Sequence, residues 1–276
     1  MIRVILILMG NILIVLQRLV PHHALSRLAG RLANSEIPWL KDLLIRSFIK
    51  VYKIDMSEYV RTDCSDFRHF NDFFTRELKP ETRKIEGSIT CPADGTVSAV
   101  GRINSNQIFQ AKGITYSLEK LLATGDIANY RDGSFITIYL APSNYHRVHF
   151  PVAATLTKAT YVPGRLFSVN QTTAENVSDL FADNERLVCL MESVAGPISV
   201  IMVGAMIVAG IKPVWRQTIY PSKQLDTEFF DPPQQYESGS ELGQFHLGST
   251  AIIVAPGEIR WQVGEGDIVR FGETLA

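Results

Sequence analysis

Cysteine is scarce in this sequence. Three occur among 276 residues, Cys64, Cys91 and Cys189, and an odd number argues for a reducing compartment rather than a disulfide framework. Their spacing matches no common set of metal ligands, so we expect no metal cofactor.

An excess of charge of either sign is also missing. Lysine and arginine total 27 against 28 aspartates and glutamates, a net charge of −1, which argues against a nucleic-acid partner. The balance is uneven along the chain, because residues 1–56 carry eight basic and three acidic side chains. A basic N-terminal segment ahead of a mildly acidic body is typical of proteins that attach to an anionic membrane surface.

A long apolar run is absent as well. Val4 to Leu16 is apolar except for Gly10 and Asn11, but a membrane-spanning helix needs about 20 apolar residues. No small-residue cleavage site of a signal peptide follows it. We expect this run to lie in the bilayer interface, with a buried helix of the soluble core as the alternative.

Two amphipathic helices are expected next, one after Pro21 and a longer one from Pro38. Their apolar residues recur at helical spacing and basic residues fill the opposite faces, which suits a phospholipid interface as well as an ordinary solvated face. A further helix over Asp66 to Phe74 is expected to dock this region on the body. The charged stretch Arg76 to Ile85 then marks a boundary.

From Cys91 onward, short strand-like runs alternate with glycine and proline turns. They predict an α+β fold, with a mainly antiparallel β catalytic domain over residues 76–276 and an N-terminal helical membrane-associating region over residues 1–75. The polar, proline-bearing segment Pro221 to Gly239 is expected to be a loop. The predicted strands are Thr96 to Ile103, Ser134 to Leu140, Ala153 to Val162, Arg186 to Met191, Ile198 to Ile211 and Thr250 to Val254, with a short helix near Tyr116 to Ala123.

A candidate nucleophile lies near the C-terminus. Ser249 directly follows Gly248 and precedes the apolar run Ala251 to Val254. Its hydroxyl can close a small ring onto the Gly248 carbonyl and turn the amide into an ester, and glycine tolerates the strained backbone that this requires. Elimination would leave a dehydroalanine that hydrolyses to a pyruvoyl group. Most Gly-Ser pairs are simple turns, so this pair needs support from elsewhere in the chain.

Two upstream motifs provide that support. Tyr145 to His149 places two histidines three residues apart, and Cys91 to Val97 holds Asp94 in a turn before a predicted strand. Together with Leu247 to Thr250, these motifs resemble the phosphatidylserine decarboxylase family of the bacterial and mitochondrial type. A departure is His246, where family members often carry lysine. The likeness continues, in order, through Phe70 to Arg76, Tyr161 to Gly164 and Leu166 to Asn170.

The resemblance implies a charge-relay set of Asp94, His149 and Ser249. His149 would take the serine proton as general base, and Asp94 would fix the tautomer of the imidazole and stabilise its charged form. Self-cleavage between Gly248 and Ser249 would then give a large chain, residues 1–248, and a small chain that starts with the pyruvoyl group, residues 249–276.

As a pyruvoyl-dependent carboxy-lyase, the chain would use no pyridoxal phosphate. The self-derived pyruvoyl group would form a Schiff base with the amine of phosphatidylserine and yield phosphatidylethanolamine. His146 is our candidate for the acid that returns a proton to the α-carbon, because His149 already serves the cleavage. The resemblance also implies a homodimer that is peripheral to the inner membrane, on its cytoplasmic side.

Two other functions fit parts of the sequence. A membrane-associated serine hydrolase or acyltransferase would use Asp94, His149 and Ser249 without self-cleavage, although the Gly-x-Ser-x-Gly elbow of α/β-hydrolases is absent. A carrier or binding module is suggested by Val263 to Glu273 with Pro92 to Val97, which are similar to the small barrels of biotinyl and lipoyl carriers. We find no lysine in a comparable hairpin turn, so we interpret this likeness as one of fold.

Overall fold

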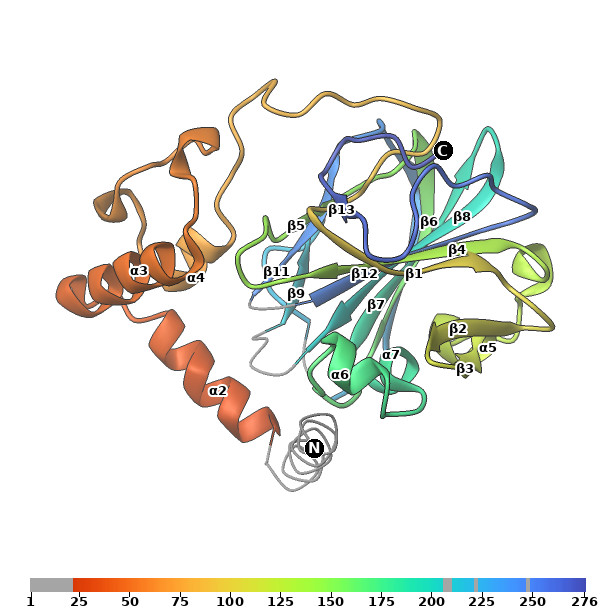
Figure 1. The fold of residues 1–276 in the computed structure, drawn as a ribbon, viewed down its shortest axis with the longest axis horizontal. Helices are drawn as coiled ribbons and strands as arrows, with labels where there is room; N and C mark the ends of the chain where they lie inside the picture. Colours follow the sequence, from red (N-terminus) through yellow and green to blue (C-terminus); the bar gives the residue numbers. More distant parts are fainter. Residues whose placement is uncertain (1–21, 206–209, 221–222, 247–248) are drawn as a thin grey trace, which may run out of the picture.

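A computed structural model describes residues 22–205, 210–220, 223–246 and 249–276 and shows an α+β fold, with a helical part beside antiparallel sheets (Figure 1). The helices are α2 (His22–Ala33), α3 (Pro38–Tyr52), α4 (Phe70–Phe74), α5 (Leu118–Leu122), α6 (Gln171–Ala174) and α7 (Leu180–Asp183). The strands are β1 (Gly95–Arg102), β2 (Gln107–Ala111), β3 (Ile114–Ser117), β4 (Ser134–Leu140), β5 (Arg147–His149), β6 (Ala154–Val162), β7 (Arg186–Ser193), β8 (Gly196–Gly204), β9 (Ile211–Pro213), β10 (Asp226–Tyr236), β11 (Glu241–Phe245), β12 (Ser249–Ala255) and β13 (Ile268–Val269).

Eight strands form the main sheet, in the order β10-β6-β7-β8-β12-β4-β1-β13. Neighbouring strands in it pair antiparallel throughout. β12 lies in the interior of this sheet, between β8 and β4, and its residues 250–255 are buried. A continuous apolar run is what a strand covered on both faces requires.

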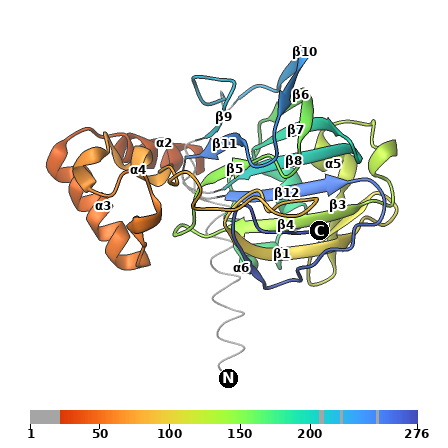
Figure 2. The same cartoon turned by 90° about the horizontal axis from the view of Figure 1, so that it is seen from above.

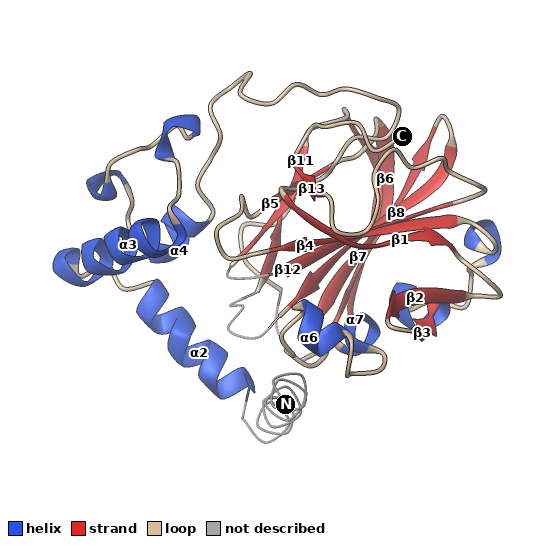
Figure 3. Ribbon diagram, in the orientation of Figure 1, coloured by secondary structure: helices blue, strands red, loops and turns tan. Residues whose placement is uncertain are grey.

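A separate layer covers each face of the main sheet (Figure 3). On one face, Val148 and Phe245 of the small sheet β5-β11-β9 share a core with Ala251 and Ile253 of β12. On the other face, α5, α7 and the hairpin β2–β3 share a second core with Ile252. Successive strand residues point to opposite faces, so odd and even positions of β12 enter different cores.

The helical part, α2 to α4, has a core of its own and lies beside the sheets (Figure 2). Ile45 and Phe73 are fully buried in it. Pro38 begins α3, where its missing N–H is not needed, and Lys53 ends the helix in the left-handed conformation with φ of 51°. The helices predicted from Pro21 and Pro38 are thereby confirmed, whereas the division of the chain at residue 75 stays a prediction.

The apolar run from Val4 to Leu16 lies outside the described residues. Within the part of the chain that the structure describes, every helix is too short or too polar to cross a bilayer. The interfacial placement of the run therefore stays a prediction.

The mainly antiparallel β body is confirmed, but the loop predicted over Pro221 to Gly239 was wrong. Within it, β10 pairs with β6 and forms an edge of the main sheet. Pro232 and Pro233 fall inside the register shift between Phe229 and Gln234, where their missing N–H groups cost no ladder hydrogen bond. A proline-bearing edge strand is hard to distinguish from a loop by sequence alone.

Three other predicted elements are divided in the structure. Ile198 to Ile211 supplies β8 and β9, which belong to different sheets. Tyr116 to Ala123 contains the end of β3 and then α5, because the Ser117 side chain accepts a hydrogen bond from the Lys120 N–H and caps the helix. Asp66 to Phe74 holds the end of a 3₁₀ turn and the short α4.

Candidate active site

The predicted nucleophile stands at the start of the central strand. Ser249 is the first residue of β12, and its backbone pairs with Leu140 of β4 on one side and Gly204 of β8 on the other. Gly248 lies outside the described residues, as does the side chain of Ser249. The predicted cleavage junction thus connects β11, which ends at Phe245, to the middle of the main sheet.

Both predicted histidines come from β5 and the turn before it, next to β11. His149 pairs with Glu241 at the beginning of β11, whereas the carbonyl of His146 accepts a hydrogen bond from the Phe245 N–H at its end, over 3.0 Å. The chain runs from the end of β11 to Ser249. The backbone of His146 therefore lies at the end of β11 that precedes the predicted cleavage site, and His149 lies at the other end. The sequence spacing of three residues did not distinguish the two histidines in this way.

His149 is buried and neutral. Its Nδ1 lies 2.8 Å from the Gly239 carbonyl, which can only accept, so Nδ1 carries the proton and Nε2 is the acceptor. The Tyr145 hydroxyl lies 3.0 Å from Nε2 and donates to it. Burial, with a smaller contribution from Arg147, lowers the pKa of His149 to about 4, against the raising effect of the Gly239 bond. His149 is therefore an unprotonated base at neutral pH.

Asp94 closes the turn that enters β1. Its Oδ1 accepts a hydrogen bond of 2.8 Å from the Phe271 N–H, and its Oδ2 lies 3.4 Å from Arg83 Nη2. Burial raises the pKa of Asp94, while the Phe271 N–H and Arg83 act in the opposite direction. A side chain at Gly95 would come within 2.4 Å of the Tyr139 carbonyl oxygen, so only glycine lets the turn join β1 here.

Phe271 brings Asp94 and His149 to one place. Its backbone binds Asp94, and its ring stacks on the imidazole of His149. Asp94 and His149 form no direct hydrogen bond, and the imidazole of His149 is held by Gly239 and Tyr145 instead. The charge-relay roles of Asp94, His149 and Ser249 therefore stay predictions.

His146 is fully buried and leaves one ring nitrogen unused. Nδ1 donates to the Asn144 carbonyl over 2.8 Å, and the ring lies 4.0 Å from that of Phe74. Nε2 has no partner among the described residues. Burial lowers the pKa of His146 to about 3, and the nearby Arg76 contributes to this shift. At neutral pH, Nε2 therefore offers a lone pair and can act as an acid only after it gains a proton.

Arg76 is a functional candidate that the sequence analysis quoted only as part of a motif. It is fully buried, and its Nη2 donates to Tyr59 Oη and to the carbonyls of Ser143 and Asn144. Its Nε and Nη1 have no partner among the described residues. A buried cation beside His146 favours an anion at this end of the site. Its position two residues after Phe74 was the available signal.

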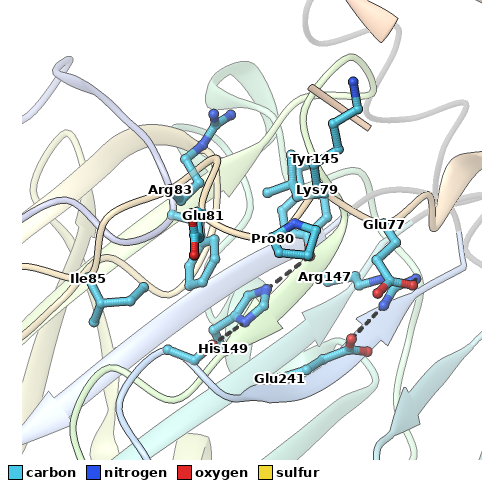
Figure 4. Close-up of a pocket in the computed structure, with 13 residues that line it drawn as sticks. Glu77, Lys79, Pro80, Glu81, Arg83, Ile85, Tyr145, Arg147, His149 and Glu241 are labelled. Atoms are coloured by element: carbon cyan, nitrogen blue, oxygen red, sulfur yellow. Dashed lines mark hydrogen bonds and ion pairs between the residues drawn. The ribbon is translucent and has the colours of Figure 1, made fainter. Parts of the chain in front are cut away.

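A cavity of about 280 Å³ opens onto His149. Figure 4 shows His149 with the Arg147–Glu241 ion pair, whose charged atoms are 2.7 Å apart, among the residues that line it. A second cavity of about 220 Å³ reaches Asp94, and the two share Tyr145 and Arg83 in their walls. Small molecules thus have room next to two of the three members of the predicted relay, His149 and Asp94.

His246, the departure from the family pattern, is also neutral. Its N–H donates to the Gly210 carbonyl over 3.1 Å, and its Nε2 has no partner among the described residues. Burial lowers its pKa to about 4, with smaller effects from Lys212 and His69. A neutral side chain therefore stands just before the junction, where many family members would place a cation.

The described residues contain no group of three histidines, cysteines or carboxylates that would hold a metal. The site holds buried, neutral imidazoles on β5 and the turn before it, in the layer whose strand β11 precedes Ser249, with the guanidinium of Arg76 beside His146. Such groups accept and return protons, and they fit a carbonyl group formed from Ser249 itself. Fold and site together present a β-rich body with buried, proton-accepting imidazoles in the layer that leads to Ser249.

Comparison with known proteins identifies the family. Residues 70–276 match the family model described as phosphatidylserine decarboxylase, and residues 12–53 match a model described as PSD. Curated proteins named phosphatidylserine decarboxylase proenzyme are similar along the whole chain. Those of Pseudomonas putida strain F1 and Pseudomonas entomophila are 50% identical, covering 97% of this chain and 98% of theirs. That of Psychrobacter arcticus is 49% identical, covering 96% of this chain and 98% of its own. The chain belongs to the phosphatidylserine decarboxylase family.

Proposed function

We propose that the chain is made as a proenzyme, cleaves itself between Gly248 and Ser249, and then decarboxylates phosphatidylserine to phosphatidylethanolamine. The observation that carries the proposal is the position of Ser249, at the head of the central strand and joined through β11 to the histidine-bearing β5. Relatives named as proenzymes of this decarboxylase, at 50% identity, support it.

In the first stage, the Ser249 hydroxyl attacks the Gly248 carbonyl and His149 accepts its proton. A pKa of about 4 keeps His149 unprotonated, and hence ready, at neutral pH. Its Nε2 already binds the Tyr145 hydroxyl, so the serine proton reaches it directly when Tyr145 moves, or through that hydroxyl. Asp94, buried on the other side of Phe271, stabilises the imidazolium that forms.

In the second stage, the pyruvoyl group supplies a carbonyl that binds the substrate amine and withdraws electrons as carbon dioxide leaves. His146 holds the proton that returns to the α-carbon. Its buried Nε2 and its place at the end of β11 that leads to Ser249 support this role. Exclusion of water from a fully buried side chain also favours loss of a charged carboxylate as a neutral gas.

The helical part is the proposed membrane contact. Four of its large apolar side chains, Leu28 and Leu32 of α2 and Trp39 and Leu43 of α3, are each more than half exposed. Basic residues lie exposed on the same part of the chain: Arg31, Arg46, Lys50 and Lys53. Exposed apolar groups interspersed with cations suit an anionic lipid surface, such as the cytoplasmic side of an inner membrane. We call these four apolar residues the interfacial surface.

A homodimer is the proposed assembly, and light scattering in detergent tests it.

The proposed function is tested by the intact mass of the purified protein, with and without Ser249→Ala. We expect two chains split after Gly248, the smaller one lighter than its sequence by the loss of ammonia that turns serine into pyruvoyl, and a single chain for the variant. A single full-length mass for the unaltered protein would overturn the proposal and favour the serine hydrolase. Conversion of phosphatidylserine to phosphatidylethanolamine by the cleaved protein completes the test.

A further inference from the structure

One buried acid close to the junction is not used by the reaction described above. Glu185 immediately precedes β7 and is 4% exposed. It forms no ion pair with any described residue, although a buried carboxylate is normally paired. Burial raises its pKa to about 7, against the smaller, lowering effect of a hydrogen bond with the hydroxyl of Tyr161 on β6. Tyr161 is the one titratable group of the described residues that contributes to this shift.

The sheet register places Gly204 of β8 between Ser249 on one side and Glu185 on the other. Gly204 pairs with Ser249, and the Gly204 N–H donates to the Glu185 carbonyl over 2.8 Å. Gly204 has no side chain, and a Cβ built on it would lie 3.8 Å from the Cβ of Glu185. Leu166 Cδ2 lies 3.7 Å from the same Cβ position, so the side chains of Leu166 and Glu185 both adjoin Gly204, the residue that pairs with Ser249.

Neighbouring residues hold this arrangement rigidly. The Asn184 side-chain amide donates to the carbonyls of Phe167 and Gly204, both over 2.9 Å, and its oxygen accepts from the Phe167 N–H. The Glu185 N–H donates to the Arg165 carbonyl over 2.8 Å. The backbone of Glu185 is thereby fixed relative to Gly204, the residue that faces Ser249.

We propose that Glu185 binds the ammonium group of phosphatidylserine beside Ser249 and takes its proton. This inference rests on the proposed function. An ammonium ion cannot add to a carbonyl until it loses a proton, and a carboxylate that has no ion-pair partner both attracts the cation and accepts that proton. The proton passes from the substrate nitrogen to a carboxylate oxygen of Glu185. One N–H bond breaks, one O–H bond forms, and no other bond changes.

The other end of the site cannot take this role as readily. Arg76 and His146 both donate to the Asn144 carbonyl, so a guanidinium charge stands beside the imidazole of His146. This charge repels an ammonium ion and attracts a carboxylate. The serine headgroup, which carries both, is then oriented with its amine toward Glu185 and its carboxylate toward Arg76.

The test compares two carbonyl reagents on Glu185→Gln. Hydroxylamine is neutral at pH 7 and needs no base to react, whereas short-chain phosphatidylserine in detergent micelles enters as an ammonium ion. After reduction with cyanoborohydride, the mass of the small chain reports the lipid adduct. We expect lipid trapping to slow by about 10²-fold or more, with hydroxylamine labelling unchanged. Glu192 is an exposed glutamate on β7, the strand that follows Glu185. The Glu192→Gln variant should match the unaltered protein with both reagents.

Each outcome decides the matter. Equal lipid trapping in Glu185→Gln and the unaltered protein would overturn the inference, as would equal slowing of both reagents, which indicates a distorted site. Glu185→Asp keeps the carboxylate and is the second variant if Glu185→Gln does not fold or cleave. Its lipid trapping should be slower than that of the unaltered protein while its hydroxylamine labelling is normal, and unchanged trapping would overturn the inference. Failure of hydroxylamine to label the unaltered protein would instead overturn the proposed function, and the inference with it.

Discussion

The imidazole of His149 stacks on the ring of Phe271, with 3.6 Å between the ring centroids and 18° between the planes. The same residue donates its backbone N–H to Asp94, so one phenylalanine contacts two of the three members of the predicted relay. The strand β13 and the turn after it thus position the site, although they lie near the C-terminal end of the chain.

Phe271→Ala should slow self-cleavage, because the imidazole loses its stacking partner while the backbone bond to Asp94 remains. Phe271 is 8% exposed, so the variant should also lose about 3 kcal/mol of unfolding free energy. The rate is measured by the appearance of the small chain on gels, and the stability by urea unfolding of the uncleaved Ser249→Ala chain. Phe271→Leu, which keeps apolar bulk, is the control and should lose less stability. Cleavage of Phe271→Ala at the unaltered rate would contradict this role.

Acid should destabilise the uncleaved chain through its buried histidines. His146 has a pKa of about 3 when folded, against about 6.5 when unfolded. The unfolded chain therefore binds a proton that the folded chain does not, and stability is lost as pH falls below about 6.5 toward the folded pKa. Between pH 7 and pH 5, His146 alone should cost about 2 kcal/mol.

The measurement for this acid effect is urea unfolding at both pH values. The Ser249→Ala chain is compared with the same chain carrying His146→Gln, so that contributions of other groups cancel. The loss of stability on acidification should be smaller in the second chain. An equal loss in both would show that His146 does not stay neutral in the folded state.

Arg76→Gln should raise the pKa of His146, because the guanidinium that disfavours the imidazolium is removed. Titration of the imidazole signals by NMR in the Ser249→Ala chain gives the value. Arg76→Lys keeps the positive charge and should leave the pKa of His146 closer to its unaltered value. Equal pKa values for the two variants would show that the charge of Arg76 does not act on His146.

Replacing Trp39 and Leu43 by glutamate should weaken binding to anionic vesicles, because both side chains belong to the interfacial surface and are 68% and 57% exposed. Two charges in place of two apolar groups should reduce the bound fraction at least about tenfold. Co-sedimentation with phosphatidylglycerol vesicles measures it. Val194→Glu is the matched control, since Val194 is fully exposed on the β7–β8 turn, away from the helical part. Equal loss of binding in the control would contradict a specific surface.

Much of the fold was predictable because local patterns determine it. The alternation and apolar runs over Ser134 to Leu140 and Thr250 to Val254 predicted β4 and β12 nearly to the residue. Pro38 and the helical spacing after it predicted α3. β10 was missed because its prolines are tolerated only by virtue of an edge position and a register shift, neither of which is a local property.

The sequence by itself identified the candidate reactive groups, because a motif specifies residue types. These are a glycine before Ser249, two histidines three residues apart, and Asp94 in a turn. The tertiary structure alone decided how these groups are arranged. Strand pairing sets which residues meet, so the register of β5 on β11 places His146 at the junction end, and that of β8 on β12 places Gly204, and behind it Glu185, beside Ser249. Burial, which also arises only from packing, keeps the imidazoles neutral and raises the pKa of the Glu185 carboxyl to about 7.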